Sequence, residues 1–379
     1  MSESERRINH ERSNFMKIAS FFAGAGGLDL GFHKAGFEIP WANEYDKAIW
    51  STYERNAPET FLDRRSITDV QASDIPNVVG MIGGPPCQSW SEAGAARGIE
   101  DHRGQLFFEY LRLIAEKKPS FFLAENVSGI LFSRHNDALG KILGMFCSLG
   151  YNVSYGLLNA NDFGVPQDRE RVIIVGYKTG LGEFFVPPTV DVSQRGKSLR
   201  DAIWDLRSSA KIANSGTYAN SDLKIPNHEY LDSSFSTMYM SRNRVRDWDE
   251  PSFTIQAGGR HCPIHPQAPK MQIVEKDVRV FAPGHEHLYR RLTVREAARI
   301  QTFPDNFIFD YRNVLDGYKM IGNAVPVEFA FHLAMKIRKD LSGNESISRR
   351  GTGVGEIASF KELGWSLDSA SNPISMKSA

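Results

Sequence analysis

A cysteine in a proline-rich turn is the most reactive group that this sequence offers. Cys87 lies within residues 83–91 (Gly-Gly-Pro-Pro-Cys-Gln-Ser-Trp-Ser), directly after an apolar run typical of a buried strand. The prolines restrict the turn, and a thiolate attacks soft electrophilic carbon well. Cys147, by contrast, stands in an apolar run that indicates core packing. The surroundings of Cys87 therefore favour a nucleophile over a core residue.

Two charged groups could work beside this thiol. Glu125 follows the apolar run 120–124, and a carboxylate at a strand end could serve as an acid or a hydrogen-bond partner. Arg171 closes the run 167–171 (Gln-Asp-Arg-Glu-Arg) at the entrance of the next apolar run, and arginine can clamp carbonyl or phosphate oxygens. Taken singly, each is equally well explained as a solvated charge at the end of a strand.

A glycine-rich turn indicates where a cofactor could bind. Residues 21–28 (Phe-Phe-Ala-Gly-Ala-Gly-Gly-Leu) lie between an apolar run and a helical pattern, and glycines there let a ligand approach the backbone. The spacing is not Gly-x-Gly-x-x-Gly, which disfavours a dinucleotide. Glu44 follows the next apolar run and could hold ribose hydroxyls. A plain tight turn and an exposed carboxylate would explain the same residues.

These groups must be positioned by alternating strands and helices. Apolar runs typical of buried strands alternate with helical patterns up to about residue 178, which predicts an α/β, doubly wound, parallel sheet with helices on both faces. The predicted strands are 17–22, 37–43, 78–82, 120–124, 152–157 and 171–177. Ligands of such sheets bind beyond the carboxyl ends of the strands.

The composition of the sequence changes after about residue 179, where Ser, Asn, Arg and Pro become frequent and the hydrophobic periodicity is lost. A second, smaller and loop-rich domain is expected there, before helical pattern returns near the end. The tail is rich in Ser and Gly and is expected to be poorly ordered. The predicted divisions are a lead-in (1–15), a catalytic and cofactor-binding domain (16–190), a recognition domain (191–305), a hinge and returning segment (306–341) and the tail (342–379).

Composition excludes several classes of protein. The 379 residues carry 45 Lys+Arg against 45 Asp+Glu, so a wholly basic nucleic-acid coat protein is not expected. The three cysteines form no Cys-x-x-Cys pair, which argues against a disulfide framework or a zinc site, and we expect no metal. The sequence has no apolar run long enough for a membrane helix, and residues 1–14 do not resemble a signal peptide, so we expect a cytoplasmic protein.

Taken together and in order, these motifs resemble the DNA (cytosine-5)-methyltransferase family from about residue 17 to residue 339. The matching segments are 22–31, 85–88, 125–127, 167–171, 291–307 and 322–327. The resemblance implies an S-adenosylmethionine-dependent methyltransferase domain with a smaller DNA-recognition domain. It also implies methyl transfer to carbon 5 of a cytosine in double-stranded DNA, through a covalent cysteine adduct and a flipped base.

The resemblance assigns roles to matching positions. Cys87 resembles the nucleophile, Glu125 its acidic partner and Arg171 the arginine that holds the cytosine carbonyl. The positions that resemble cofactor contacts are Phe22, Gly24, Gly26, Leu28, Glu44, Leu106 and Asn323. One departure is Ser66, which stands where the family commonly has an acid near the adenine of the cofactor; Asp63 or Asp69 could substitute.

The second domain resembles the recognition region of bacterial methylases that modify GGCC. Residues 241–300 carry 11 Lys+Arg and 7 Asp+Glu, a net of +4 that the rest of the chain balances, as expected of a DNA-facing surface. In an extended strand, the arginines at alternate positions from 242 to 246 would share one face. Arg242, Arg244 and Arg260 are the predicted guanine readers. A charged surface strand is the plainer explanation.

Other functions remain open at this point. A transfer-RNA cytosine methyltransferase would use the same motifs, and a catalytically inactive DNA-binding homologue would keep the same scaffold. A nicotinamide or flavin oxidoreductase is disfavoured by the glycine spacing and by the turn around Cys87. For the methylase we expect a monomer that acts on DNA without a membrane, paired with a cognate restriction endonuclease.

Overall fold

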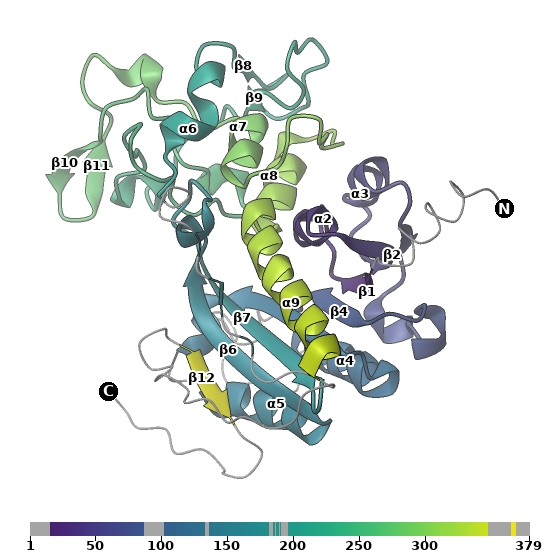
Figure 1. The fold of residues 1–379 in the computed structure, drawn as a ribbon. Coiled ribbons are helices and arrows are strands. Elements are labelled where there is room, and N and C mark those ends of the chain that lie inside the picture. Colours follow the sequence, from purple (N-terminus) through teal and green to yellow (C-terminus); the bar gives the residue numbers. More distant parts are fainter. Residues whose placement is uncertain are drawn as a thin grey trace.

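A central sheet of eight strands organises the computed structural model (Figure 1). The structure describes residues 16–86, 102–132, 136–181, 196–347 and 365–368, and positions 185, 187, 188 and 190. The strands are β1 (Met16–Phe21), β2 (Phe37–Asn43), β3 (Phe61–Asp63), β4 (Gly80–Gly83), β5 (Phe121–Val127), β6 (Tyr151–Asn159), β7 (Glu170–Lys178) and β12 (Trp365–Asp368). Their order in the sheet is β12-β6-β7-β5-β4-β1-β2-β3.

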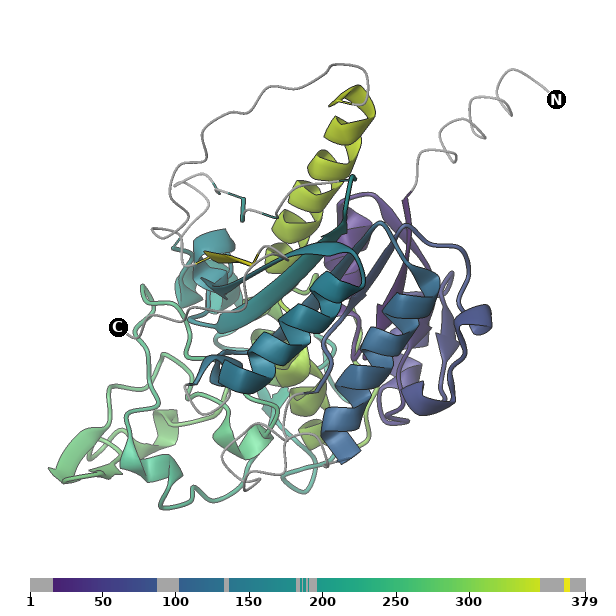
Figure 2. The ribbon, with the colours of Figure 1, turned by 90° about the horizontal axis from the view of Figure 1, so that it is seen from below.

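Helices cover both faces of this sheet (Figures 1 and 2). Because successive side chains of a strand point to opposite faces, β1 contributes Ile18 to one core cluster and Ala19 and Phe21 to another. The first cluster lies under α2 (Gly27–Lys34) and α9 (Val327–Ile347), and the second lies under α4 (His102–Lys117) and α5 (Asn136–Ser148). The short α3 (Trp50–Asn56) follows β2. The predicted doubly wound fold is therefore confirmed.

The prediction of a parallel sheet is wrong at β7 and at the edge strand β12. β7 runs antiparallel to both of its neighbours, β5 and β6, whereas β1 to β5 pair in parallel. A turn at residues 160–169 joins β6 to β7 without a crossover helix, and such a short connection can only join antiparallel strands. The start of β7 therefore lies at the same edge of the sheet as the end of β5.

The region beyond the sheet is rich in loops. It contains α6 (Leu199–Ile203), α7 (Val294–Ile300) and α8 (Val314–Asn323), with the strand pairs β8 (Lys211–Ile212) with β9 (Glu229–Tyr230) and β10 (Gln272–Glu275) with β11 (Val278–Val280). Figure 1 shows these elements grouped at one end of the sheet, with α8 leading into the long α9 that returns across it. Among the described residues, no helix is both long and apolar enough to cross a membrane.

The tail differs in part from the expectation of disorder after residue 341. Helix α9 continues to Ile347, and Trp365–Asp368 pair antiparallel with β6 at the edge of the sheet. The remaining residues of the tail, and the predicted lead-in 1–15, lie outside the described residues.

Candidate active site

The geometry of the sheet brings Glu125 and Arg171 into contact. In the antiparallel pairing of β5 with β7, Val127 lies opposite Arg171 and Glu125 opposite Ile173. Glu125 and Arg171 are therefore diagonal neighbours on one face. Nε of Arg171 lies 2.8 Å from Oε1 of Glu125, and both side chains are nearly buried. A charge-assisted pair of this kind fixes both groups in place.

The turn that leads to Cys87 lies beside this pair. Nδ2 of Asn126 donates to the carbonyl of Pro85 at 3.1 Å. A Cβ atom added at Gly84 would lie 3.3 Å from Oε2 of Glu125, so the backbone of the turn passes close to the carboxylate. Cys87 itself lies outside the described residues. The described residues thus place Glu125, Arg171 and the base of the predicted nucleophile turn at one edge of the sheet.

Arg169 is a buried residue that the sequence reasoning did not single out. Its guanidinium is 1% exposed and donates to the carbonyls of Ile255, Gly322 and Ala324 at 2.9–3.0 Å. Burial lowers the pKa of Arg169 well below its ordinary value, and the charge of Arg171 lowers it further. The two arginines of one motif therefore differ: Arg171 faces the site, and Arg169 binds backbone carbonyls of the recognition region and of the end of α8. Strand alternation does not predict this difference, because residues two apart in a strand share a face and would be expected to have the same surroundings.

The predicted cofactor loop joins β1 to α2. Gly24 (φ 56°) and Gly26 (φ 88°) adopt the left-handed backbone conformation that favours glycine. The N–H of Gly24 donates to Oε2 of Glu44 at 2.9 Å, and the N–H of Asp46 donates to Oε1 at 2.7 Å. Burial raises the pKa of Glu44, while these two donors oppose that change. Each carboxylate oxygen keeps a further acceptor site, as ribose hydroxyls would require.

The other predicted cofactor contacts differ in how deeply their side chains are buried. Phe22 and Leu106 are partly buried and pack against the same core cluster. Asn323 is exposed at the end of α8, and the residues after it reach the loop, since a Cβ atom at Gly27 would lie 2.3 Å from the carbonyl oxygen of Val325. The side chain of Leu28 packs into the core. Any cofactor contact of Leu28 is therefore left to its backbone.

Ser66 takes a structural role at the position where the family commonly has an acid. Its Oγ accepts from the N–H of Thr68 at 3.4 Å and caps a short 3-10 helix, Ile67–Asp69. Asp63 is buried and pairs with Arg65, with Nη2 to Oδ2 at 2.6 Å. Asp63 is thus already engaged as a partner of arginine, and Asp69 is exposed.

The predicted guanine readers lie on neighbouring segments of the second domain. Val245 and Ile264 form a parallel bridge, which places the segment of Arg242 and Arg244 alongside the segment after Arg260. The described chain here is a 3-10 turn followed by coil, so it is not an extended strand in which the arginines would share one face. Arg242 and Arg260 are exposed, whereas Arg244 donates from Nε to the carbonyl of Tyr239 at 3.0 Å.

The third arginine of this segment does not join the predicted face. Nη2 of Arg246 lies 2.8 Å from Oδ2 of Asp168, in the turn before β7, and Nη1 lies 3.2 Å from Oε1 of Glu250. Arg246 therefore connects the recognition region to the catalytic domain.

Comparison with known proteins agrees with this geometry. The family model for C-5 cytosine-specific DNA methylases matches residues 16–339, which include strands β1 to β7, the predicted cofactor loop and the predicted recognition region. The chain belongs to this family. It is an S-adenosylmethionine-dependent DNA (cytosine-5)-methyltransferase.

Individual relatives match along most of their length. The chain is 54% identical to the type II methyltransferase M.NgoPII of Neisseria gonorrhoeae, over 86% of this chain and 97% of the relative. It is 51% identical to the type II methyltransferase M.FnuDI of Fusobacterium nucleatum, over 88% and 97%. A solved structure from Escherichia coli, described as a DNA modification methyltransferase encoded within a prophage, aligns with a TM-score of 0.65 at 25% identity, over 86% of this chain and 99% of that one.

Proposed function

We propose that this methyltransferase modifies the inner cytosine of GGCC in double-stranded DNA through a covalent adduct on Cys87, with the target base flipped out of the helix. The observation that carries the chemistry is the ion pair of Glu125 with Arg171, beside the turn that ends at Cys87. The GGCC assignment rests on the resemblance of the recognition region and on the exposed Arg242 and Arg260. Arginine paired with guanine is the commonest specific contact in the major groove.

The reaction requires carbon 5 of cytosine to become nucleophilic. The Cys87 thiolate would add to carbon 6, which removes the aromaticity of the ring and moves an electron pair toward carbon 5. Glu125 would hold a proton at ring nitrogen 3, and Arg171 would bind the oxygen on carbon 2. S-adenosylmethionine would supply the electrophilic methyl group, and its sulfur would keep the electron pair of the broken bond and leave as a neutral thioether. Loss of the carbon 5 proton to water and expulsion of the Cys87 thiolate then restore the aromatic ring.

Base flipping follows from where these groups lie. Glu125 and Arg171 are nearly buried at the edge of a sheet, so they cannot reach a base that is stacked within a duplex. Flipping costs a few kcal/mol of lost stacking and pairing. A 2-aminopurine at the target position should therefore fluoresce more strongly when the enzyme binds.

The chemistry and the site are tested together by transfer of labelled methyl groups to duplexes. We expect transfer to a duplex with one GGCC site, none to a scrambled duplex, and none by Cys87→Ala. Transfer to a different sequence would retain the mechanism and refute the GGCC assignment. Folded protein that binds the cofactor but methylates transfer RNA, or nothing, would favour the RNA-modifying or inactive alternative.

The cellular role follows from the same proposal. As the methylase of a restriction-modification system, the enzyme would act in the bacterial cytoplasm as a monomer and protect GGCC from a cognate endonuclease. The high identity to type II methyltransferases along nearly their full length supports this role.

A further inference from the structure

Three buried side chains form a hydrogen-bonded cluster behind the predicted cofactor loop. Oγ of Ser20 on β1 donates to Oδ1 of Asp29 on α2 at 2.6 Å. The hydroxyl of Tyr53 on α3 donates to Oδ2 of the same carboxyl at 2.5 Å. Ser20, Asp29 and Tyr53 are 0%, 5% and 1% exposed. One carboxyl thus connects three elements.

The cluster spans the base of the loop. Ser20 is the second-last residue of strand β1, just before the loop, and Asp29 lies in the first turn of helix α2, just after it. A hydrogen bond between them fixes the distance between the two ends of the loop. Burying a carboxyl is costly unless hydrogen bonds compensate, so both donors are needed to keep Asp29 in this position.

Tyr53 also supports the loop directly. A Cβ atom at Gly26 would lie 3.2 Å from Cε2 of Tyr53, so the ring lies against the loop backbone. On its other side the loop is held by the N–H of Gly24, which donates to Glu44. The loop is therefore fixed between Glu44 and the ring whose hydroxyl binds Asp29.

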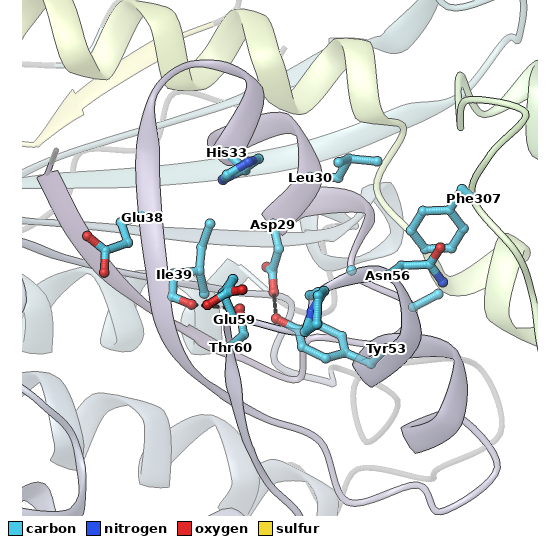
Figure 3. A pocket seen from close by; sticks show the side chains of 14 residues that line it. Asp29, Leu30, His33, Glu38, Ile39, Tyr53, Asn56, Glu59, Thr60 and Phe307 are labelled. Atoms are coloured by element: carbon cyan, nitrogen blue, oxygen red, sulfur yellow. Dashed lines mark hydrogen bonds between the residues drawn. The ribbon is translucent and has the colours of Figure 1, made fainter. Parts of the chain in front are cut away.

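Packing alone does not hold this ring. A cavity of about 250 Å³ lies between α2, β2 and α3, and Asp29 and Tyr53 both line it (Figure 3). Of the predicted cofactor contacts, Gly26 alone lines this cavity, so the cavity overlaps the predicted cofactor site at that residue only. Because one side of the cluster faces empty volume, the hydrogen bonds to Asp29 carry more of the positioning.

We propose that Asp29 and Tyr53 are positioning residues that set the affinity for S-adenosylmethionine by fixing the glycine loop against Glu44. This inference rests on the proposed assignment of the loop to the cofactor. Neither residue touches the cofactor in this proposal; they act through Gly26 and the ends of the loop.

The test compares two tyrosine-to-phenylalanine variants of the full chain. Tyr53→Phe removes the hydroxyl that binds Asp29. Tyr177→Phe is the matched control, because its buried hydroxyl donates to Asp340 of α9 at 2.8 Å, and Tyr177 lies opposite Phe121, where β5 begins, away from the loop. Calorimetric titration with S-adenosylmethionine should show roughly five- to tenfold weaker binding for Tyr53→Phe, the loss expected for one buried hydrogen bond, and no change for Tyr177→Phe.

Kinetics and two further variants complete the test. KM for S-adenosylmethionine should rise in Tyr53→Phe while kcat stays within about twofold, and Ser20→Ala should behave alike. Equal binding by Tyr53→Phe, Tyr177→Phe and wild type would overturn the inference and leave the cluster as core packing. If Glu44→Ala also binds normally, the cofactor-loop assignment itself fails; if Glu44→Ala alone loses binding, only the positioning inference fails.

Discussion

The arginines of the recognition region differ in what already binds them. Arg260 is exposed, whereas Arg244 is half-buried, donates to the carbonyl of Tyr239 and stacks over the Tyr239 ring at 4.8 Å. Burial lowers the pKa of Arg244, and the charge of Arg242 adds to this effect. A base contact by Arg244 would therefore have to form beside its interaction with Tyr239, or replace it.

This difference predicts different results for two substitutions. Arg260→Ala should cost roughly 1–3 kcal/mol of discrimination at one base position and leave thermal stability unchanged. Arg244→Ala should relax base choice and also lower the melting temperature. The measurements are methylation rates on duplexes in which each position of GGCC is varied, with Arg55→Ala as an exposed control on α3. Uniform weakening on every duplex would instead mark the arginine as a phosphate contact.

At the scale of elements, helix α7 begins in a buried polar network. Thr293 caps α7 by accepting from the N–H of Glu296 at 3.0 Å, and its hydroxyl also lies 2.9 Å from Nδ1 of His228. Glu296 is fully buried and forms a bidentate pair with Arg290, and the charge of Arg290 lowers the pKa of Glu296 to about 2 against the effect of burial. This cap and its network therefore join the start of α7 to His228 and Arg290.

Loss of this cap should be more costly than loss of an exposed one. Thr293→Ala removes a cap and leaves Nδ1 of His228 without its partner, so the free energy of unfolding should fall by roughly 2–3 kcal/mol. Ser198→Ala removes the similar but exposed cap of α6 and should cost about 1 kcal/mol. Denaturant titration measures both. Equal losses would show that the buried network adds nothing to the cap.

At the scale of the whole molecule, Asp29 links stability to pH. Burial raises the pKa of Asp29 from 3.8 to about 6, although Ser20 and Tyr53 oppose this. The folded state therefore keeps a proton that the unfolded chain releases near pH 4, so Asp29 reduces stability as pH rises from about 4 to 6. Two units of pKa correspond to roughly 3 kcal/mol.

The variant Asp29→Asn removes this titration. As pH rises from 4 to 6, the unfolding free energy of the wild type should fall relative to that of Asp29→Asn. Above pH 7 the difference between the two should be constant. Denaturant titrations at several pH values provide the measurement. A difference that is flat across this range would show that Asp29 does not hold its proton in the folded state.

The sequence determined the parts of this protein that local patterns encode. Apolar runs located all six predicted strands to within a few residues, because burial imposes its periodicity on the sequence. The ordered motifs identified the family, and glycine at positions 24 and 26 identified a loop that requires a left-handed backbone. Each of these features depends on neighbours along the chain.

The tertiary structure decided which groups meet. In a wholly parallel sheet, Arg171 at the start of β7 would lie at the opposite edge from Glu125 at the end of β5; the reversal of β7 brings them to 2.8 Å. The binding of Asp29 by Tyr53, 24 residues further along the chain, likewise depends on how elements pack. Periodicity shows that a strand exists and which face is buried, but strand direction and side-chain partners depend on contacts between residues far apart in sequence.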